Sequence, residues 1–168
     1  MSGLAQRRMA KNESWEACDP AAVDDVFSEP WMQEYARLWN AEQAMVTELA
    51  RQRFSAVIGY GFPDCAAPKS MLVVRLGLVE CAGRYDGREL DWDLRAAPAH
   101  WSRWLHQGID LSTILVEIGA NRFQIWKGDH KRILRKPPLV GALLRAFALM
   151  LEVRVQPHSD DDDPAASG

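Results

Sequence analysis

Apolar positions first recur with a helical period. Behind the capping residue Ser28 and the early-turn residue Pro30, spacings of three and four predict an amphipathic helix that runs to about Gln52. Its stripe consists of Trp31, Tyr35, Leu38, Glu42, Met45 and Leu49, of which Glu42 is the only polar member. The period then changes to two, because residues 54–62 alternate strictly up to Pro63, and this predicts a strand.

Two further strands are predicted at residues 71–76 and 78–85. Asp86 and Gly87 follow directly, and this pair is typical of a two-residue type I′ turn, so we expect a hairpin with a fourth strand at residues 90–95. In that register the facing pairs are Tyr85 with Arg88, Arg84 with Glu89, and Cys81 with Trp92. The opposite charges in the second pair agree with cross-strand pairing.

Alternation within the fourth strand separates two faces. Leu90, Trp92 and Leu94 fall on one face, whereas Asp91, Asp93 and Arg95 fall on the other. We therefore expect a sheet with one side against the core and one side in water.

Three more helices and one more strand are predicted beyond it. One helix begins at Pro98 and ends at Gly108, a second short helix follows, residues 122–127 alternate as a strand, and a last helix comes after Pro137 and Pro138. Their apolar stripes are Trp101, Trp104 and Leu105; Leu111, Ile114, Leu115 and Ile118; and Val140, Leu143, Leu144, Phe147, Met150 and Leu151. Consecutive strands flanked by helices predict an α+β fold, with a mainly antiparallel sheet and helices on one face.

Composition agrees with one globular domain. The chain has 168 residues, of which 48% are hydrophobic and 26% charged, so neither a disordered nor a membrane-spanning protein is indicated. The longest apolar stretch, residues 139–151, is interrupted by Arg145 and falls short of the roughly 20 residues that span a bilayer. The first residues show no apolar run typical of a secretory signal, so we expect a cytoplasmic protein with Cys18, Cys65 and Cys81 reduced.

Charge divides the chain into three parts. We expect a flexible N-terminal arm at residues 1–26 with a net charge of −2, and a disordered acidic tail at residues 156–168 with −4, owing to the run Asp160–Asp163. Since the whole chain carries −3, the predicted domain at residues 27–155 carries +3. The folded part is therefore mildly basic.

Candidate catalytic groups are few. His100 and His106 are six residues apart rather than the four that place two ligands on one helical face. Asp91 and Asp93 are explained by strand alternation rather than by a metal. We therefore expect no catalytic residue, no metal, no cofactor and no nucleic-acid partner. An esterase or hydratase that uses either histidine stays the last-ranked alternative.

A basic segment follows the last predicted strand. It consists of Lys127, Lys131, Arg132, Arg135 and Lys136, and it directly precedes a helix rich in Leu and Phe. Cations beside apolar residues are typical of proteins that contact anionic bilayers, so these five are predicted to dock on a membrane. The alternative is a solvated turn whose cations pair with Glu117, Asp129 or Glu152.

Several stretches together resemble a known family. They are WMQEYARLWNAEQ, FSAVIGYGF, GRYDGRELDWDLRA, PAHWSRWLHQG and RFQIWKGD, and between Phe27 and Met150 they resemble the sterol carrier protein 2 (lipid-transfer) domain family in a bacterial single-domain form. The resemblance implies a five-stranded sheet covered by helices, with a hydrophobic tunnel between them that holds fatty acyl chains, acyl-CoA or sterol-like lipids. It implies binding and carriage of these lipids without catalysis.

Carried over to this sequence, the resemblance assigns apolar residues to the tunnel wall. The expected lipid-binding residues are Ile58, Tyr60, Val73, Trp92, Trp101, Trp104, Leu105, Ile114, Leu115, Ile118, Phe123, Ile125, Phe147 and Met150. An accessory protein that presents a lipid-like substrate, such as a quinone precursor, to partner enzymes is the alternative function. Exposed tryptophans are also typical of protein interfaces, so a homodimer stays an alternative.

Overall fold

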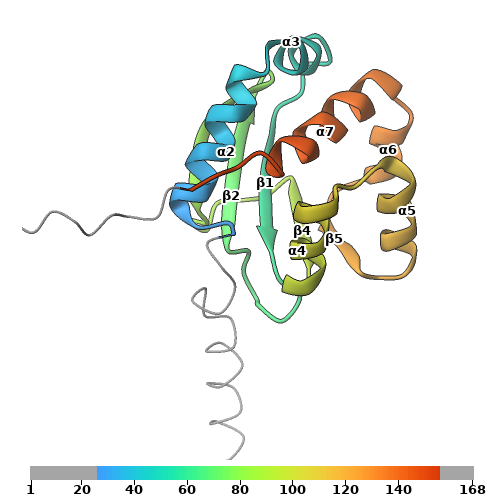
Figure 1. Ribbon diagram of the computed structural model, residues 1–168. Coiled ribbons are helices and arrows are strands. Elements are labelled where there is room, and N and C mark those ends of the chain that lie inside the picture. The colour runs from blue at the N-terminus through green and yellow to red at the C-terminus, as the bar shows by residue number, and fades with distance from the viewer. Residues whose placement is uncertain (1–25, 156–168) are drawn as a thin grey trace, which may run out of the picture.

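The computed structural model describes residues 26–155 (Figure 1). The predicted arm and tail lie outside the described residues, apart from Val26. The described part contains six helices and five strands: α2 (Glu29–Ala41), α3 (Gln43–Arg51), β1 (Ala56–Gly61), β2 (Ser70–Arg75), β3 (Leu78–Arg84), β4 (Trp92–Ala96), α4 (Pro98–Gln107), α5 (Leu111–Gly119), β5 (Phe123–Lys127), α6 (His130–Leu134) and α7 (Pro137–Met150). The predicted α+β fold is confirmed.

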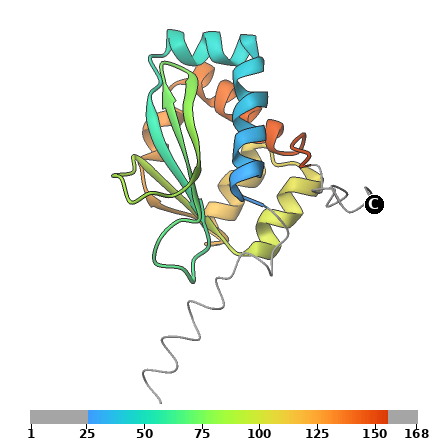
Figure 2. The ribbon, with the colours of Figure 1, turned by 90° about the vertical axis from the view of Figure 1, so that its left-hand side faces the viewer.

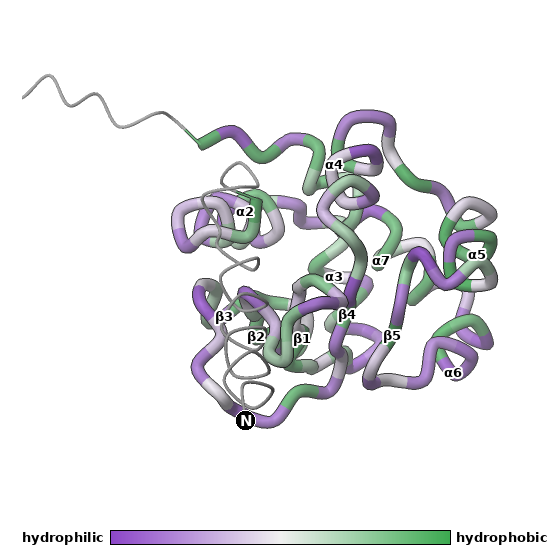
Figure 3. The backbone as a smooth tube through the Cα atoms, turned by 90° about the horizontal axis from the view of Figure 1, so that it is seen from below, coloured by the Kyte–Doolittle hydropathy of each residue, from purple (hydrophilic) through white to green (hydrophobic). Residues whose placement is uncertain are grey.

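The five strands form one sheet in the order β3-β2-β1-β4-β5. β1 and β4 are parallel, and the other three pairs are antiparallel, so the sheet is mainly antiparallel as predicted. Seen from the side, α2, α4 and α7 lie on one face of the sheet (Figure 2). Helices α5 and α6 lie beyond its β5 end (Figure 3).

The predicted hairpin between the third and fourth strands is wrong. β3 pairs only with β2, while β4 pairs with β1 and β5. Gly87 has a φ of 91°, but Asp86 does not share the positive φ that a type I′ turn requires. The Asp86 carboxylate instead accepts a hydrogen bond from the backbone N–H of Arg88 at 3.1 Å. The edge of β1 that faces away from β2 is available for pairing in the centre of the sheet. The largely buried strand β4 pairs there, rather than beside the mostly exposed strand β3 at the edge of the sheet.

The predicted solvated face of the fourth strand is also wrong at two residues. Arg95 is 0% exposed and Asp93 is buried. The Arg95 guanidinium donates to the carbonyl oxygens of Phe62 at 3.0 Å and Cys65 at 2.7 Å, pairs with Asp93, and lies 4.1 Å from the ring centroid of Trp126. Burial of this charge is tolerated because the β1–β2 loop replaces its hydration with hydrogen bonds.

Two smaller expectations need correction. The first predicted helix is divided at Glu42, whose ψ of 80° leaves the helical region and whose carboxylate accepts a hydrogen bond from Arg145 of α7 at 2.8 Å. Cys65 is disulfide-bonded rather than reduced. Cys81 is a free, exposed thiol.

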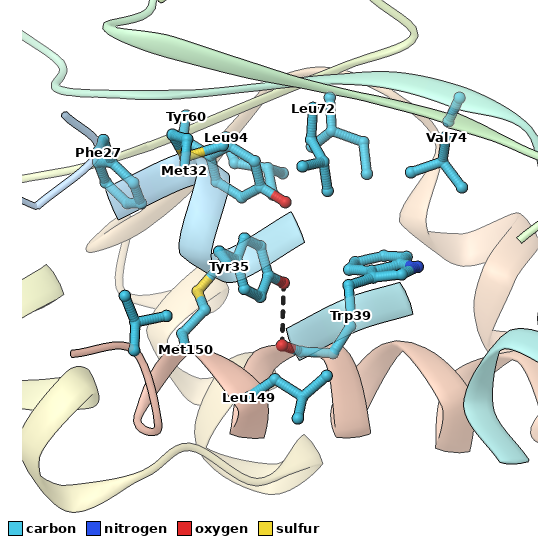
Figure 4. Close-up of a cluster of buried hydrophobic side chains, with 14 of the residues drawn as sticks. Phe27, Met32, Tyr35, Trp39, Tyr60, Leu72, Val74, Leu94, Leu149 and Met150 are labelled. Atoms are coloured by element: carbon cyan, nitrogen blue, oxygen red, sulfur yellow. Dashed lines mark hydrogen bonds between the residues drawn. The ribbon is translucent and has the colours of Figure 1, made fainter. Parts of the chain in front are cut away.

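The core lies between α2 and the sheet. Phe27 stacks on Tyr60 with ring centroids 5.4 Å apart and meets Trp101 edge-on at 4.9 Å. Tyr35 and Trp39 follow at helical spacing and are almost fully buried (Figure 4). These large rings supply much of the apolar area removed from water, which is the main favourable contribution to folding.

Candidate functional site

An apolar pocket of about 130 Å³ lies between the sheet and helices α5, α6 and α7. Strands β1, β4 and β5 form one wall, and α2 contributes Tyr35 and Trp39. Ten of the fourteen residues predicted from the family resemblance line it: Ile58, Tyr60, Trp92, Ile114, Leu115, Ile118, Phe123, Ile125, Phe147 and Met150. The structure thus brings together residues that span almost a hundred positions of the chain.

The other four predicted residues lie outside this pocket. Val73 sits between Leu72 and Val74, both of which are buried, and strand alternation turns it to the opposite face of the sheet. Trp101 and Trp104 belong to the packed core, where the indole N–H of Trp101 donates to the carbonyl of Gly61 at 3.0 Å. Leu105 lines a separate cavity between α4 and the end of α7, and Trp101 also borders that cavity.

Sequence reasoning missed several residues of the pocket wall. Besides the α2 rings they include Phe54, Leu94, Leu111, His130, Ile133, Leu134, Val140, Leu143, Leu144 and Ala146. Most belong to apolar stripes that were visible in the sequence but were not assigned to the site. Helix α6 gave no such signal, because its five residues form little more than one turn within the basic segment.

The Trp92 side of the pocket depends on a glycine. Gly128 follows β5 with a φ of 115°, a conformation that side-chain-bearing residues rarely adopt. A Cβ atom there would lie 2.2 Å from the ring of Trp92. The ring therefore occupies space that exists only because residue 128 has no side chain.

Two tyrosine hydroxyls lie among these apolar side chains. The Tyr35 hydroxyl donates to the carbonyl oxygen of Ala146 in α7 at 2.9 Å (Figure 4). Burial raises the pKa of Tyr35 well above its ordinary value, and burial also raises the pKa of Tyr60. Both phenols are therefore neutral at physiological pH. A dry wall with neutral hydroxyls suits an uncharged, apolar part of a ligand.

The pocket opens between α5 and α6. Leu115 of α5 is 42% exposed and Leu134 of α6 is 37% exposed, yet both line the pocket. Side chains that reach both the interior and the solvent mark the rim of an opening. Val116, the neighbour of Leu115, is 61% exposed and does not line the pocket.

Helix α5 is held by an ion-pair cluster. Its one buried residue is Glu117, although most of its other residues are apolar. The Glu117 carboxylate accepts hydrogen bonds from Arg122 at 2.8 and 2.9 Å and from Arg103 of α4 at 3.0 Å. The hydrogen bond from Arg122 is the main reason that the pKa of Glu117 lies below its usual value.

The five residues of the predicted basic segment are all exposed. Lys127 pairs with Glu89 at 3.3 Å. Lys131, Arg132, Arg135 and Lys136 have no ion-pair partner among residues 26–155.

The acidic partners of the alternative interpretation are engaged elsewhere. Glu117 binds two other arginines, and Glu152 lies 3.4 Å from Arg145. The Asp129 side chain caps α6 by accepting from the backbone N–H of Arg132 at 3.3 Å.

The two helix histidines make separate local contacts. His106 Nδ1 lies 2.7 Å from the carbonyl oxygen of Ser102, and the His100 ring stacks on Trp104 at 6.0 Å. Within the described part of the chain, no three His, Cys, Asp or Glu side chains are grouped to hold a metal ion. None of the described helices is long and apolar enough to cross a bilayer.

Two solved structures are similar to this chain. A conserved hypothetical protein from Thermus thermophilus, described as a candidate sterol carrier protein, matches with a TM-score of 0.59 and 21% identity over 79% of this chain and 92% of that chain. A crystal structure of sterol carrier protein 2 matches with a TM-score of 0.57 and 22% identity over 77% and 99%. No protein-family model and no curated protein matches the sequence. The chain has the fold of sterol carrier protein 2.

Proposed function

We propose that this protein binds the apolar part of a lipid, such as a fatty acyl chain, the acyl part of an acyl-CoA or a sterol-like molecule, and carries it without catalysis. The observation that carries the proposal is the pocket itself, whose wall is mainly apolar and whose polar groups include the neutral tyrosine hydroxyls and His130. The fold shared with sterol carrier protein 2 supports the same function.

The size of the pocket constrains how a lipid binds. An engineered cavity of about 150 Å³ holds a benzene molecule, so about 130 Å³ is too small for a long acyl chain. A longer ligand requires the wall to move outward. Helix α5 is the element suited to this movement, because none of its apolar residues is fully buried. Each methylene group that leaves water contributes roughly 0.8 kcal/mol toward opening the pocket.

The ligand-free protein, titrated with palmitate and followed by native mass spectrometry, tests this function. We expect a one-to-one complex. Ile118→Trp adds bulk to the pocket wall and should weaken binding at least tenfold. Val116→Trp makes a similar change on the same helix at an exposed residue outside the wall, so it should leave the affinity within about twofold.

Two results would contradict the proposal. One is a folded wild-type protein that binds neither palmitate nor cholesterol. The other is a pair of tryptophan variants that bind palmitate equally well, because the ligand would then occupy a different site.

A further inference from the structure

We propose that the rim formed by α5 and α6 docks on a bilayer surface rich in anionic phospholipid, with the mouth of the pocket facing the membrane. This inference rests on the proposed function, since it assigns a place where the lipid is loaded and delivered. We call the docking region the mouth surface and define it by Leu115, Val116, Leu134 and the four cations Lys131, Arg132, Arg135 and Lys136.

The apolar part of the mouth surface lies where the pocket meets solvent. Leu115 of α5 and Leu134 of α6 both line the pocket and are exposed, and Val116 extends the exposed apolar area along α5. Beyond the β5 end of the sheet, no described strand lies outside these two helices (Figures 1 and 3). Apolar side chains at this site can enter the boundary between headgroups and acyl chains.

The charged part of the mouth surface is suited to phosphate-bearing headgroups. Lys131 and Arg132 lie on α6, while Arg135 and Lys136 follow it and lead into α7. Their exposed side chains have no acidic partner within residues 26–155, as described above. The acidic groups close in sequence to the mouth are Asp129, which caps α6, and Glu117, which two arginines neutralise. The local charge is therefore positive.

The interleaving of the two kinds of residue favours a bilayer over an acidic protein. Leu134 is directly followed by Arg135, so insertion of the leucine brings the cation to headgroup depth. A bilayer also receives the lipid that leaves the pocket without exposing it to water. An acidic protein surface would satisfy the charges but would give the apolar cargo no such path.

Partitioning of the full-length protein onto sedimenting vesicles tests the inference. One set of vesicles contains phosphatidylcholine alone, and the other also contains phosphatidylglycerol. Wild-type protein should partition onto the anionic vesicles at about 10 mM salt and much less at 150 mM, because the Debye length falls from about 30 Å to about 8 Å. The triple variant Lys131→Glu, Arg132→Glu, Arg135→Glu should partition about a hundredfold less at low salt.

A matched triple variant distinguishes the effect of where the cations lie from the effect of the net charge of the protein. Arg37→Glu, Arg51→Glu, Arg84→Glu makes the same change in net charge at exposed residues on α2, α3 and β3. It should retain most of the partitioning. Neither variant alters the pocket wall, so palmitate binding in vesicle-free solution should remain within about twofold for both.

Three results would overturn the inference. The first is equal partitioning of wild type and the mouth-surface variant. The second is an equal loss in both triple variants, which would show an effect of net charge alone. The third is wild-type protein that binds no anionic vesicles, including the case in which it binds an acidic protein instead. Each is independent of palmitate binding in solution, which tests the proposed function separately.

Discussion

Helices α2 and α5 both carry apolar stripes, but only one of them is covered. α2 buries Trp31, Met32, Tyr35 and Trp39, whereas α5, the more apolar of the two, buries only Glu117. The aromatic side chains of α2 pack on one another and on Phe27, and Tyr35 donates to α7, while the apolar residues of α5 line a pocket or face solvent. An apolar helix that lacks partners within its own fold indicates a surface that another molecule completes.

The difference between α2 and α5 also distinguishes residues that stabilise the fold from residues that bind the ligand. Side chains that are packed on all sides contribute most to folding, because their removal leaves a cavity. Side chains that line an existing pocket or reach solvent leave little new empty space when shortened. The α2 half of the molecule should therefore determine stability, and the α5 half should determine ligand affinity.

The largest difference is expected between two leucines. Leu72 on β2 is 0% exposed and lies outside the pocket wall, so Leu72→Ala should lower the free energy of unfolding by about 2–5 kcal/mol. Leu115→Ala, at the rim, should lower it by about 0.5 kcal/mol or less. Urea titration followed by circular dichroism measures both. Equal losses would show that α5 is as tightly packed as the core.

A smaller loss is expected at a glycine of the pocket wall. Gly128→Ala should lower the free energy of unfolding by about 1–3 kcal/mol, because an alanine at a φ of 115° is strained and its Cβ would overlap the Trp92 ring. It should also weaken palmitate binding, since Trp92 lines the pocket.

The same substitution on α5 provides the control. Gly119 has no atom within 4 Å of an added Cβ, so Gly119→Ala should raise the free energy of unfolding by up to about 1 kcal/mol. Thermal unfolding of the two variants side by side gives the comparison. A destabilised Gly119→Ala variant would contradict the loose packing assigned to this helix.

The smallest effect is confined to α5 and depends on pH. The pKa of Glu117 is lowered chiefly by its hydrogen bond from Arg122, and the pKa of Asp110, which caps α5, is lowered chiefly by the backbone N–H of Thr113. A lowered pKa means that each carboxylate stabilises the helix when ionised and that this contribution is lost on protonation. Protection of α5 amides from hydrogen exchange, corrected for the intrinsic rate, should therefore fall as the pH drops below about 4.5.

Glu117→Gln distinguishes the contribution of the Glu117 carboxylate to the stability of α5 from that of Asp110. The variant should have weaker protection of α5 at pH 7 and a smaller decrease on acidification, since only Asp110 still titrates in this helix. Protection of α2 should be the same in both proteins. A decrease as large as that of the wild type would show that Glu117 does not hold α5.

Local sequence signals predicted elements well and long-range pairing poorly. Pro98 and Gly108 correctly bounded α4, because both act within one turn of their own position. Asp86 and Gly87 indicated a turn, but their sequence could not show that β4 pairs with β1 instead of β3. Arg95 was assigned to solvent for the same reason, since the loop that buries it comes from about thirty residues earlier in the chain.

The candidate site shows a similar division. The family resemblance supplied most of the pocket wall on β1, β4, β5, α5 and α7. It did not supply Tyr35 and Trp39, because their helical spacing indicates a core stripe and they belong to both core and pocket. Trp101 and Trp104, which the resemblance also assigns to the tunnel wall, belong to the packed core and lie outside this pocket, since an apolar helix that faces the sheet can pack against it as well as line a cavity.

Hydrogen exchange of the wild-type protein with and without saturating palmitate tests most directly that a ligand completes α5. We expect palmitate to slow exchange of the amides of α5 and α6 by tenfold or more, while those of α2 and β2 change little, since most apolar side chains of both elements are already buried in the ligand-free protein. Slower exchange restricted to α2 and the core, or bound palmitate with unchanged α5 amides, would contradict this expectation.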